Sequence, residues 1–250
     1  MAAIAAIAAD GDPGDPGDPR APGAVDVSLL REAALIAGKD LRIEARARVV
    51  GQQVVPFGLI VLLLFAFALD PDRGVLTRVA PGLFWVTVLL AVLLGVSRAF
   101  ALEADNGARD ALRMSGLDGS SIFLGKAGAL AVELLAFEAL LTLGVVVLFD
   151  VRLASLPPLI LASAAATVGL AAAGTLYGVL AAGIRARETL VPMLLLPVVA
   201  PVLLGATRAW EASIDGVPGD AWPWVGLLVI FATLFVGIGM LAFGPLLEES

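Results

Sequence analysis

Long apolar stretches separated by short polar segments fill most of the chain after residue 48. A helix needs about 20 predominantly apolar residues to cross the hydrocarbon core of a bilayer. Six stretches reach that length, and their approximate bounds are Val49–Leu69, Val79–Ser97, Ile122–Phe149, Leu156–Ile184, Thr189–Thr207 and Val225–Leu247. Because backbone groups in lipid must find their hydrogen bonds within each segment, the pattern predicts an all-α integral membrane protein with six transmembrane helices.

Two segments precede the first predicted span. Residues 1–25 contain three Gly-Asp-Pro repeats, whose prolines remove helix donors and whose aspartates repel one another, so we expect a disordered tail. The folded domain is then expected over 26–250. Within 27–48 an apolar stripe recurs at spacings of four, three and four, formed by Leu30, Ala34, Ala37 and Leu41. Most basic residues of this segment lie off that stripe, which favours an amphipathic helix at the membrane surface; the alternative is a solvated cytosolic helix.

The distribution of lysine and arginine predicts the orientation of the spans. With the N-terminus in the cytoplasm, eleven basic residues flank the spans on the cytoplasmic side and four on the other. Such residues gather on the cytoplasmic side, so both termini are expected there. Trp210, Trp222 and Trp224 bracket the last outer loop, where indole rings favour the membrane interface.

Composition narrows the chemistry that the chain can perform. Apolar residues make up 60% of the chain and charged residues 16%, and both cysteine and histidine are absent. This excludes disulfides, Cys/His metal sites, His-dependent nucleophilic triads and a histidine ligand to haem iron. The net charge of -7 comes with no basic patch that would suit nucleic acid. Tyr177, Met193 and Met240 remain as candidate iron ligands, but we expect them to be ordinary core residues.

The longest predicted inner loop runs from Arg98 to Ser121 and mixes acidic with basic residues. Ala108, Leu112 and their neighbours recur at helical spacing, and Gly107 is placed to separate two short helices. A short cytoplasmic helix between two spans suits docking into a groove of a soluble partner; the alternative is a plain connecting loop.

No ATP-binding loop is found in the chain. Gly125 and Lys126 are followed by Ala127 instead of serine or threonine, so the phosphate-binding pattern fails. The chain is therefore expected not to be an enzyme, and any ATPase must be another chain. Lys126 is interpreted as an interfacial anchor with its amine among lipid headgroups.

Four residues inside the spans are candidates for a pathway or a polar site: Glu133, Glu138, Pro192 and Pro197. A charge at the bilayer centre costs roughly 3 kcal/mol, so each glutamate should face protein or water, or be protonated. Five residues turn a helix by about 140°, so the two carboxyls cannot share one face. An interhelical hydrogen bond is the alternative to a functional role. The prolines, with Pro201, predict a bent helix, and the alanines and glycines of the fourth span predict close helix packing.

Four stretches of the chain resemble the CcmB family, the membrane subunit of the ABC-type complex of cytochrome c maturation. These stretches are Ala80–Val86 (APGLFWV), Ser97–Phe100 (SRAF) followed by Glu103 and Gly107, Ile122–Lys126 (IFLGK), and Leu190–Pro197 (LVPMLLLP) running on to Arg208 and Ala209. The resemblance covers about residues 27–247.

The resemblance implies an ABC-2-type permease half in the bacterial plasma membrane, with a surface helix before the first span and a coupling helix after the second. Such a subunit pairs with a cytosolic ATPase, CcmA, which binds the ATP, and usually works as two permeases with two ATPases. The family also involves CcmC, CcmD and the haem chaperone CcmE. On the resemblance, the contact with the ATPase falls on Arg98, Phe100, Glu103, Gly107, Arg109 and Leu112.

The family is described as a haem exporter. In an alternative view of the family, ATP hydrolysis releases the haem-loaded chaperone from CcmC, and haem does not cross CcmB. The lack of histidine and cysteine favours the mechanical role. Two other functions stay open: an ABC-2 permease for a drug or a lipid-linked glycan, and a proton-coupled carrier that uses Glu133 and Glu138 without an ATPase. A membrane-embedded enzyme is least supported, because the loops lack clustered acids or nucleophile–base pairs.

Overall fold

A computed structural model gives the fold of the protein, and all regular secondary structure in its described ranges is helical. The structure describes residues 22–47, 54–69, 73–105, 118–181 and 187–249. The helices of these ranges are α2 (Pro22–Ala47), α3 (Val55–Ala68), α4 (Arg73–Asp105), α6 (Gly119–Phe149), α7 (Leu156–Ala181), α8 (Arg187–Ile214) and α9 (Pro218–Glu249). The prediction of an all-α protein is confirmed for this part of the chain.

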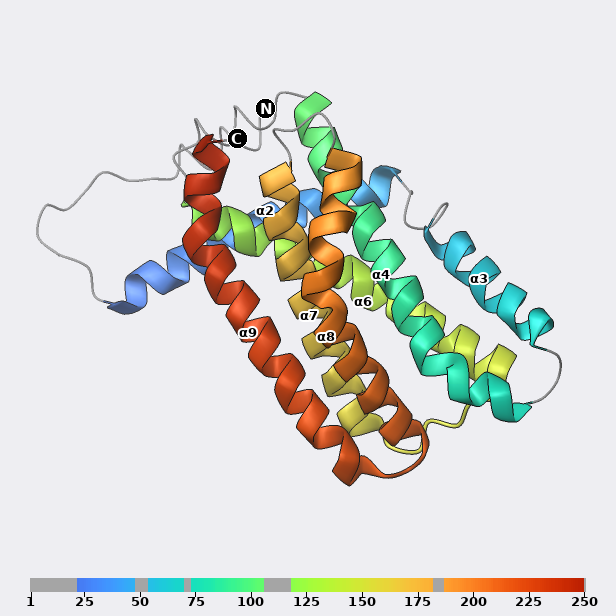
Figure 1. The fold of residues 1–250 in the computed structure, drawn as a ribbon. Coiled ribbons are helices and arrows are strands. Elements are labelled where there is room, and N and C mark those ends of the chain that lie inside the picture. Colours follow the sequence, from blue (N-terminus) through green and yellow to red (C-terminus); the bar gives the residue numbers. More distant parts are fainter. Residues whose placement is uncertain (1–21, 48–53, 70–72, 106–117, 182–186, 250) are drawn as a thin grey trace, which may run out of the picture.

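The helices from α3 to α9 alternate in direction and form one bundle (Figure 1). The bundle therefore has two distinct ends. One end carries α2, the last turns of α4, α7 and α9, and the first turns of α6 and α8; we call it the α2 end. The other, which we call the far end, carries the short connection from α6 to α7 and that from α8 to α9.

Five helices are long and apolar enough to cross a membrane, namely Gly74–Arg98, Gly119–Phe149, Leu156–Leu180, Pro192–Ile214 and Pro218–Leu246. They correspond to the second to sixth predicted spans. The first predicted span overlaps α3, which has 14 residues. At 1.5 Å per residue α3 is about 21 Å long, less than the hydrocarbon thickness of about 30 Å. The structure therefore shows a multi-pass membrane protein with five long spans and one short apolar helix.

Several helices extend beyond the bounds that hydropathy predicts. Helix α4 continues from the apolar span to Asp105, because the segment after Arg98 is rich in alanine, leucine and glutamate, which are strong helix formers. Helix α8 continues to Ile214, and its last turns carry an ion pair between Arg208 and Glu211 at 2.8 Å. Helix α2 begins at Pro22, before the expected start of the folded domain at residue 26. Proline is well tolerated in the first turn of a helix.

Helix α7 lies at the centre of the bundle and touches α4, α6, α8 and α9. Its alanines at 162, 166 and 171–173 have no exposed surface. A Cβ on Gly174 would lie 2.8 Å from Cγ2 of Val96 in α4, so only glycine lets these two helices come so close. The close packing predicted for this alanine-rich and glycine-rich span is confirmed within the subunit.

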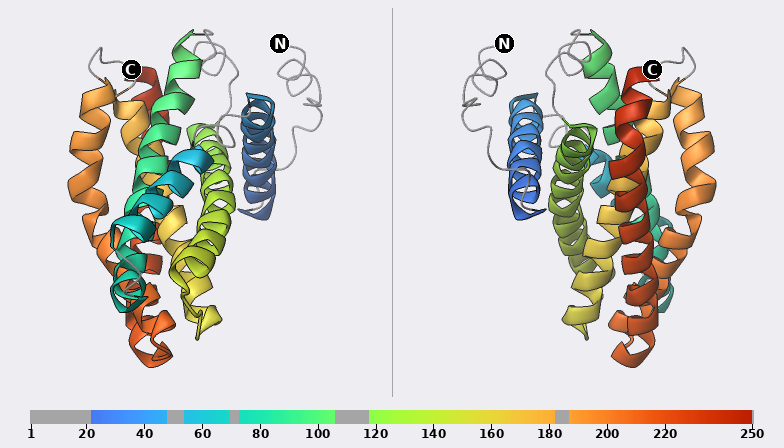
Figure 2. Two further views of the ribbon diagram at one scale, coloured as in Figure 1. Left: turned by 90° about the vertical axis from the view of Figure 1, so that its right-hand side faces the viewer. Right: turned by 90° about the vertical axis from the view of Figure 1, so that its left-hand side faces the viewer.

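Helix α2 lies across the bundle at its own end and packs against α6 on the outside of the spans (Figure 2). The residues that it buries are Ala33 and Ile36, with 7% and 5% exposure. The stripe predicted from spacing does not make this contact, since Leu30 at its start is 63% exposed. The side that docks is thus adjacent to the predicted apolar stripe.

Candidate functional site

Charged side chains from three helices meet where α2 crosses the bundle. Arg98 Nε in α4 lies 3.5 Å from Glu44 Oε2 in α2. Lys126 Nζ in α6 lies 4.0 Å from Asp40 Oδ2, and Lys39 Nζ lies 3.1 Å from Asp40 Oδ1. We call these five residues the α2 junction. They connect α2 to both helices that flank the loop between α4 and α6.

The close approach of α2 to α6 depends on Gly125. A Cβ at this position would lie 2.6 Å from Cβ of Ile36 and 2.9 Å from the backbone oxygen of Ala33. Both distances are well inside ordinary van der Waals contact, which is about 3.5–4.0 Å between carbons. Gly125 therefore lets α2 lie directly on α6, and this places Asp40 within reach of Lys126.

The prediction that Lys126 anchors the span in the headgroups is wrong. The Lys126 side chain is only 8% exposed and points toward Asp40 of α2. A buried ammonium group requires a nearby anion, and Asp40 supplies one. Hydropathy could not reveal this contact, because the partner lies more than 80 positions earlier in the chain.

Glu133 lies at the edge of the α2 junction. It is seven residues, or about two turns, after Lys126 and so lies on the same side of α6. Its half-buried carboxyl is within electrostatic range of Glu44, Asp40 and Arg98. Glu133 thus adds a third acidic group to those that α2 brings to this end of the bundle.

Glu138 lies elsewhere, in the contact between α6 and α7. Its side chain is 3% exposed, and Oε1 is hydrogen-bonded to the hydroxyl of Thr167. The same hydroxyl lies 2.8 Å from the backbone oxygen of Ser163. The Thr167 hydroxyl therefore points its one hydrogen toward two acceptors, the Glu138 carboxyl of α6 and the backbone oxygen of its own helix. Glu138 joins two helices, which is the alternative that its sequence position left open.

The two glutamates do not form a paired carboxylate site. Glu133 faces the α2 junction and Glu138 faces Thr167 of α7. This separation follows from their spacing of five residues on one helix.

Most residues expected to contact an ATPase lie outside the residues whose side chains are described. Arg98 is described and pairs with Glu44. Phe100 and Glu103 belong to the last turns of α4, but their side chains are not described. Gly107, Arg109 and Leu112 fall in 106–117, outside the described residues.

The proline-containing span is one continuous helix, α8, with Pro192, Pro197 and Pro201 inside it. Pro192 is half-buried, whereas Pro197 and Pro201 are exposed on the outer surface of the bundle. Of these prolines, only Pro192 has a side chain that is partly enclosed by the described part of the subunit.

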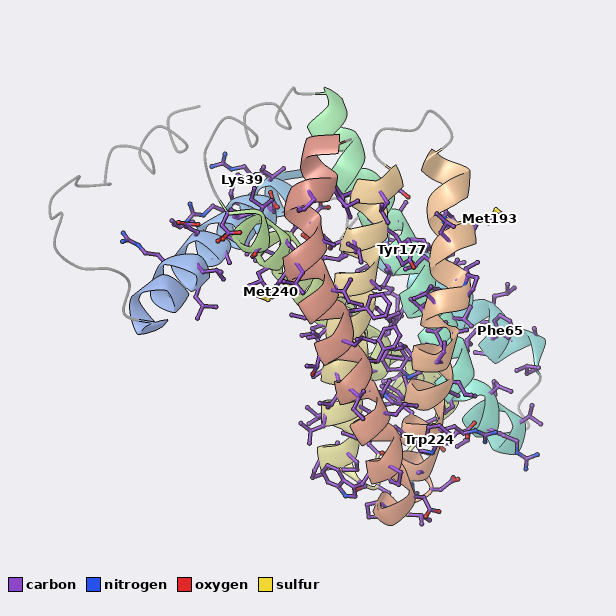
Figure 3. The ribbon with its side chains drawn as sticks, turned by 60° about the vertical axis from the view of Figure 1, so that its left-hand side comes forward. Lys39, Phe65, Tyr177, Met193, Trp224 and Met240 are labelled. Atoms are coloured by element: carbon purple, nitrogen blue, oxygen red, sulfur yellow. The ribbon has the colours of Figure 1, made fainter. Side chains whose placement is uncertain are left out.

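The sequence predicts that all three candidate iron ligands lie in the core, and this prediction is wrong for Met193. Met193 is 69% exposed on α8, and only Tyr177 of α7 and Met240 of α9 are half-buried. Figure 3 shows the three residues on three different helices. Among the described residues, no cluster of three or more His, Cys, Asp and Glu side chains is placed to hold a metal ion.

A buried aromatic cluster near the far end was missed by the sequence reasoning. The Phe84 ring is stacked on Trp210 with centroids 4.0 Å apart, and Trp85 meets both rings edge-on. The prediction that Trp210 lies at the membrane interface is wrong, since it is 1% exposed and its Nε1 donates to Ser163 Oγ at 2.9 Å. The adjacent Phe84 and Trp85 in α4 were the available signal, because aromatic pairs of this kind often anchor helix contacts.

Comparison with known proteins gives a consistent result. The family model described as CcmB protein matches residues 31–249. The chain is similar to heme exporter protein B of Paracoccus denitrificans, with 29% identity over 214 residues that cover 83% of this chain and 92% of that protein. It is also similar to heme exporter protein B of Pseudomonas aeruginosa (30% identity, 66% and 74% covered) and of Escherichia coli K12 (28% identity, 74% and 82% covered).

Proposed function

The chain belongs to the CcmB family, and from that premise we propose that it is the membrane permease subunit of a haem exporter in cytochrome c maturation. The observation that carries this proposal is the family match, which begins at residue 31 within α2 and extends over every long span of the structure. Relatives named heme exporter protein B cover most of the same length.

We propose that the subunit takes its energy from a separate ATPase, similar to CcmA, that docks on the loop between α4 and α6. Two features of the structure support this. Helix α4 carries its helical structure past the span to Asp105, so a force on the loop acts directly on a span. Helix α6 begins at Gly119 on the other side of the loop, and Asp118 caps it by accepting a hydrogen bond from Ser120 N at 2.8 Å.

The α2 junction is suited to pass on such a movement. If α4 and α6 shift relative to each other at the α2 end, the pairs Arg98–Glu44 and Lys126–Asp40 cannot both keep their geometry. Helix α2 must then follow one span or the other. ATP-driven movement requires that the ATPase bind the two arrangements with different affinities. In this mechanism Phe100, Glu103, Gly107, Arg109 and Leu112 contact the ATPase.

The proposed assembly contains two copies of this chain and two ATPase subunits, with membrane proteins similar to CcmC and CcmD and a haem chaperone similar to CcmE. We place the α2 end on the cytoplasmic side of a bacterial inner membrane. In this arrangement α3 is a further span, the first in the chain and the shortest, and it brings the number of spans to six. The excess of basic residues at this end supports the orientation.

We propose further that the subunit acts mechanically and does not ligate haem iron. The candidate ligands Tyr177, Met193 and Met240 lie on separate helices, and Met193 faces outward. A proton-coupled carrier is disfavoured because Glu133 and Glu138 have different neighbours. Haem is then the cargo of the whole complex.

The test is affinity purification of the tagged full-length chain from its native membrane in mild detergent, with identification of the proteins that accompany it. We expect an ATPase together with CcmC-like and CcmE-like proteins. Reversing the loop charges, with Glu103→Lys and Arg109→Glu, should reduce ATPase recovery at least tenfold. Arg208→Glu at the far end is the matched control and should leave recovery unchanged. Recovery of a drug or glycan exporter, or of the chain without any ATPase, would contradict the proposal.

A further inference from the structure

Helix α2 separates its charges onto different sides. Its acidic residues Asp40 and Glu44 point into the α2 junction, where Lys126 and Arg98 neutralise them. Glu32, the remaining acidic residue among those of α2 whose side chains are described, is half-buried. Two of the acidic side chains of α2 are thus directed toward the protein.

An apolar strip covers a second side of α2. Leu30, Ala34 and Ala45 are exposed and Leu41 is half-buried, and all lie within about 60° of one another at 100° per residue. Lys39 lies on the opposite side of the helix. Figure 3 shows Lys39 on the side of α2 that faces the end of the bundle. The apolar strip consequently faces toward the middle of the spans, which is the direction of the hydrocarbon core.

Three arginines form a row on the remaining side, which points away from α6. Arg31, Arg42 and Arg46 are all exposed, and they also lie within about 60° of one another. No ion pair joins any of them to a residue in the described part of the chain. Leu35, 47% exposed, lies among them. This row therefore borders the apolar strip with positive charge and an apolar patch.

A helix that lies flat with its apolar strip in the hydrocarbon boundary holds the neighbouring arginines at the depth of the lipid phosphates. The guanidinium group binds phosphate with two parallel hydrogen bonds, and its stem can cover apolar surface at the same time. We propose that the row Arg31, Arg42 and Arg46 is a binding site for anionic phospholipid headgroups, which hold α2 against the membrane. Such a site requires only that the chain spans a membrane, and it is independent of the cargo and of the ATPase.

The experiment measures which lipids lie beside α2. The chain has no cysteine, so Leu35→Cys supplies one attachment site for a fluorophore within the arginine row. The full-length protein is placed in phosphatidylcholine nanodiscs that contain equal small fractions of doxyl-labelled phosphatidylglycerol or doxyl-labelled phosphatidylcholine, with the doxyl group at the same acyl position. The ratio of quenching by the two lipids reports the local enrichment of the anionic one.

We expect several-fold stronger quenching by phosphatidylglycerol, since each basic residue near a surface contributes attraction equivalent to about fivefold in affinity. The triple variant Arg31→Gln, Arg42→Gln, Arg46→Gln should bring the ratio close to one, and 1 M salt should do the same in the unmodified sequence. Arg208→Gln is the matched control, because it removes one positive charge at the far end, where Arg208 is already paired with Glu211. A fluorophore at Leu234→Cys on the exposed side of α9 should show no preference.

Three results would overturn the assignment. A ratio near one at low salt removes the lipid site altogether. A high ratio that survives the triple substitution assigns the selectivity to other residues. Absence of quenching by either lipid, with loss of a co-purifying protein in the triple variant, makes the row a protein-docking surface. Salt titration of the unsubstituted arginines keeps the proposal testable if the triple variant is not recovered in folded form.

Discussion

Gly125 and Gly128 are three residues apart on α6 and differ sharply in what surrounds them. A Cβ on Gly125 would lie 2.6 Å from Cβ of Ile36 and 2.9 Å from the backbone oxygen of Ala33. A Cβ on Gly128 would meet nothing within 4 Å. Replacing either glycine by alanine adds the same methyl group. Because only the methyl group at position 125 would overlap α2, only Gly125→Ala should displace α2.

The size of the effect follows from the geometry. Neither Cβ of Ile36 nor the oxygen of Ala33 can move without the α2 backbone, so relieving the overlap requires α2 to shift by about 1 Å. Overpacking of this kind costs about 1–3 kcal/mol. Replacing glycine by alanine in a helix contributes about 1 kcal/mol in favour of α6 in both variants. The difference between the variants is thus the cost of the overlap alone, and it acts on the docking of α2.

Hydrogen exchange of the α2 amides in nanodiscs measures this docking, because local opening sets the exchange rate. A loss of 1–3 kcal/mol corresponds to about 5- to 150-fold faster exchange. We expect this acceleration in α2 for Gly125→Ala and unchanged exchange for Gly128→Ala. Adding Ile36→Ala should not restore protection, since Cβ of residue 36 and the oxygen of Ala33 remain. Equal exchange in the two glycine variants would refute the close contact between α2 and α6.

Two further predictions concern the packing of α6 against α9 and α7. Gly239→Ala would place its Cβ 2.0 Å from the Phe123 ring, so we expect a cost of about 1–3 kcal/mol and a lower Tm; Gly237→Ala has open space and should not lower the Tm, and equal melting of the two would contradict this packing. Thr167→Val keeps the side-chain shape but removes the hydroxyl bonded to Glu138, which should cost about 1–3 kcal/mol in thermal unfolding. Thr167→Ser retains the hydroxyl and should melt close to the unmodified protein; a valine variant of full stability would show that the bond contributes nothing.

Features that depend on one helix alone were predictable from the sequence. The number of apolar residues needed to cross a bilayer located the five long spans, and the spacing of Glu133 and Glu138 separated their carboxyls. The small residues of α7 indicated a helix enclosed by its neighbours, because only such residues let helices approach closely in a membrane.

Features that depend on a distant partner were not predictable in this way. Spacing showed that α2 has an apolar stripe, but not that Ala33 and Ile36 would be buried instead, since Gly125 in another helix creates the space they fill. Their positions at the ends of apolar spans predicted that Lys126 and Trp210 lie at the membrane interface. Their burial follows from Asp40 and Ser163, which are far from them in the chain and were not recognisable as partners.

The strength of the α2 junction bears on whether α2 can take part in a movement. The pair of Arg98 and Glu44 is partly exposed, with 27% and 14% exposure of the two side chains, and a pair of this kind usually contributes about 0–1 kcal/mol. Ile36 and Ala33 also pack closely against Gly125 of α6. Close packing of this kind resists small displacements of α2 more than the ion pairs do. A contact held by a few such interactions keeps α2 in one place at rest. A partner can still move α2 if its binding free energies for the two positions of α2 differ by a few kcal/mol. A helix that couples an ATPase to the spans must move in response to a difference of this size.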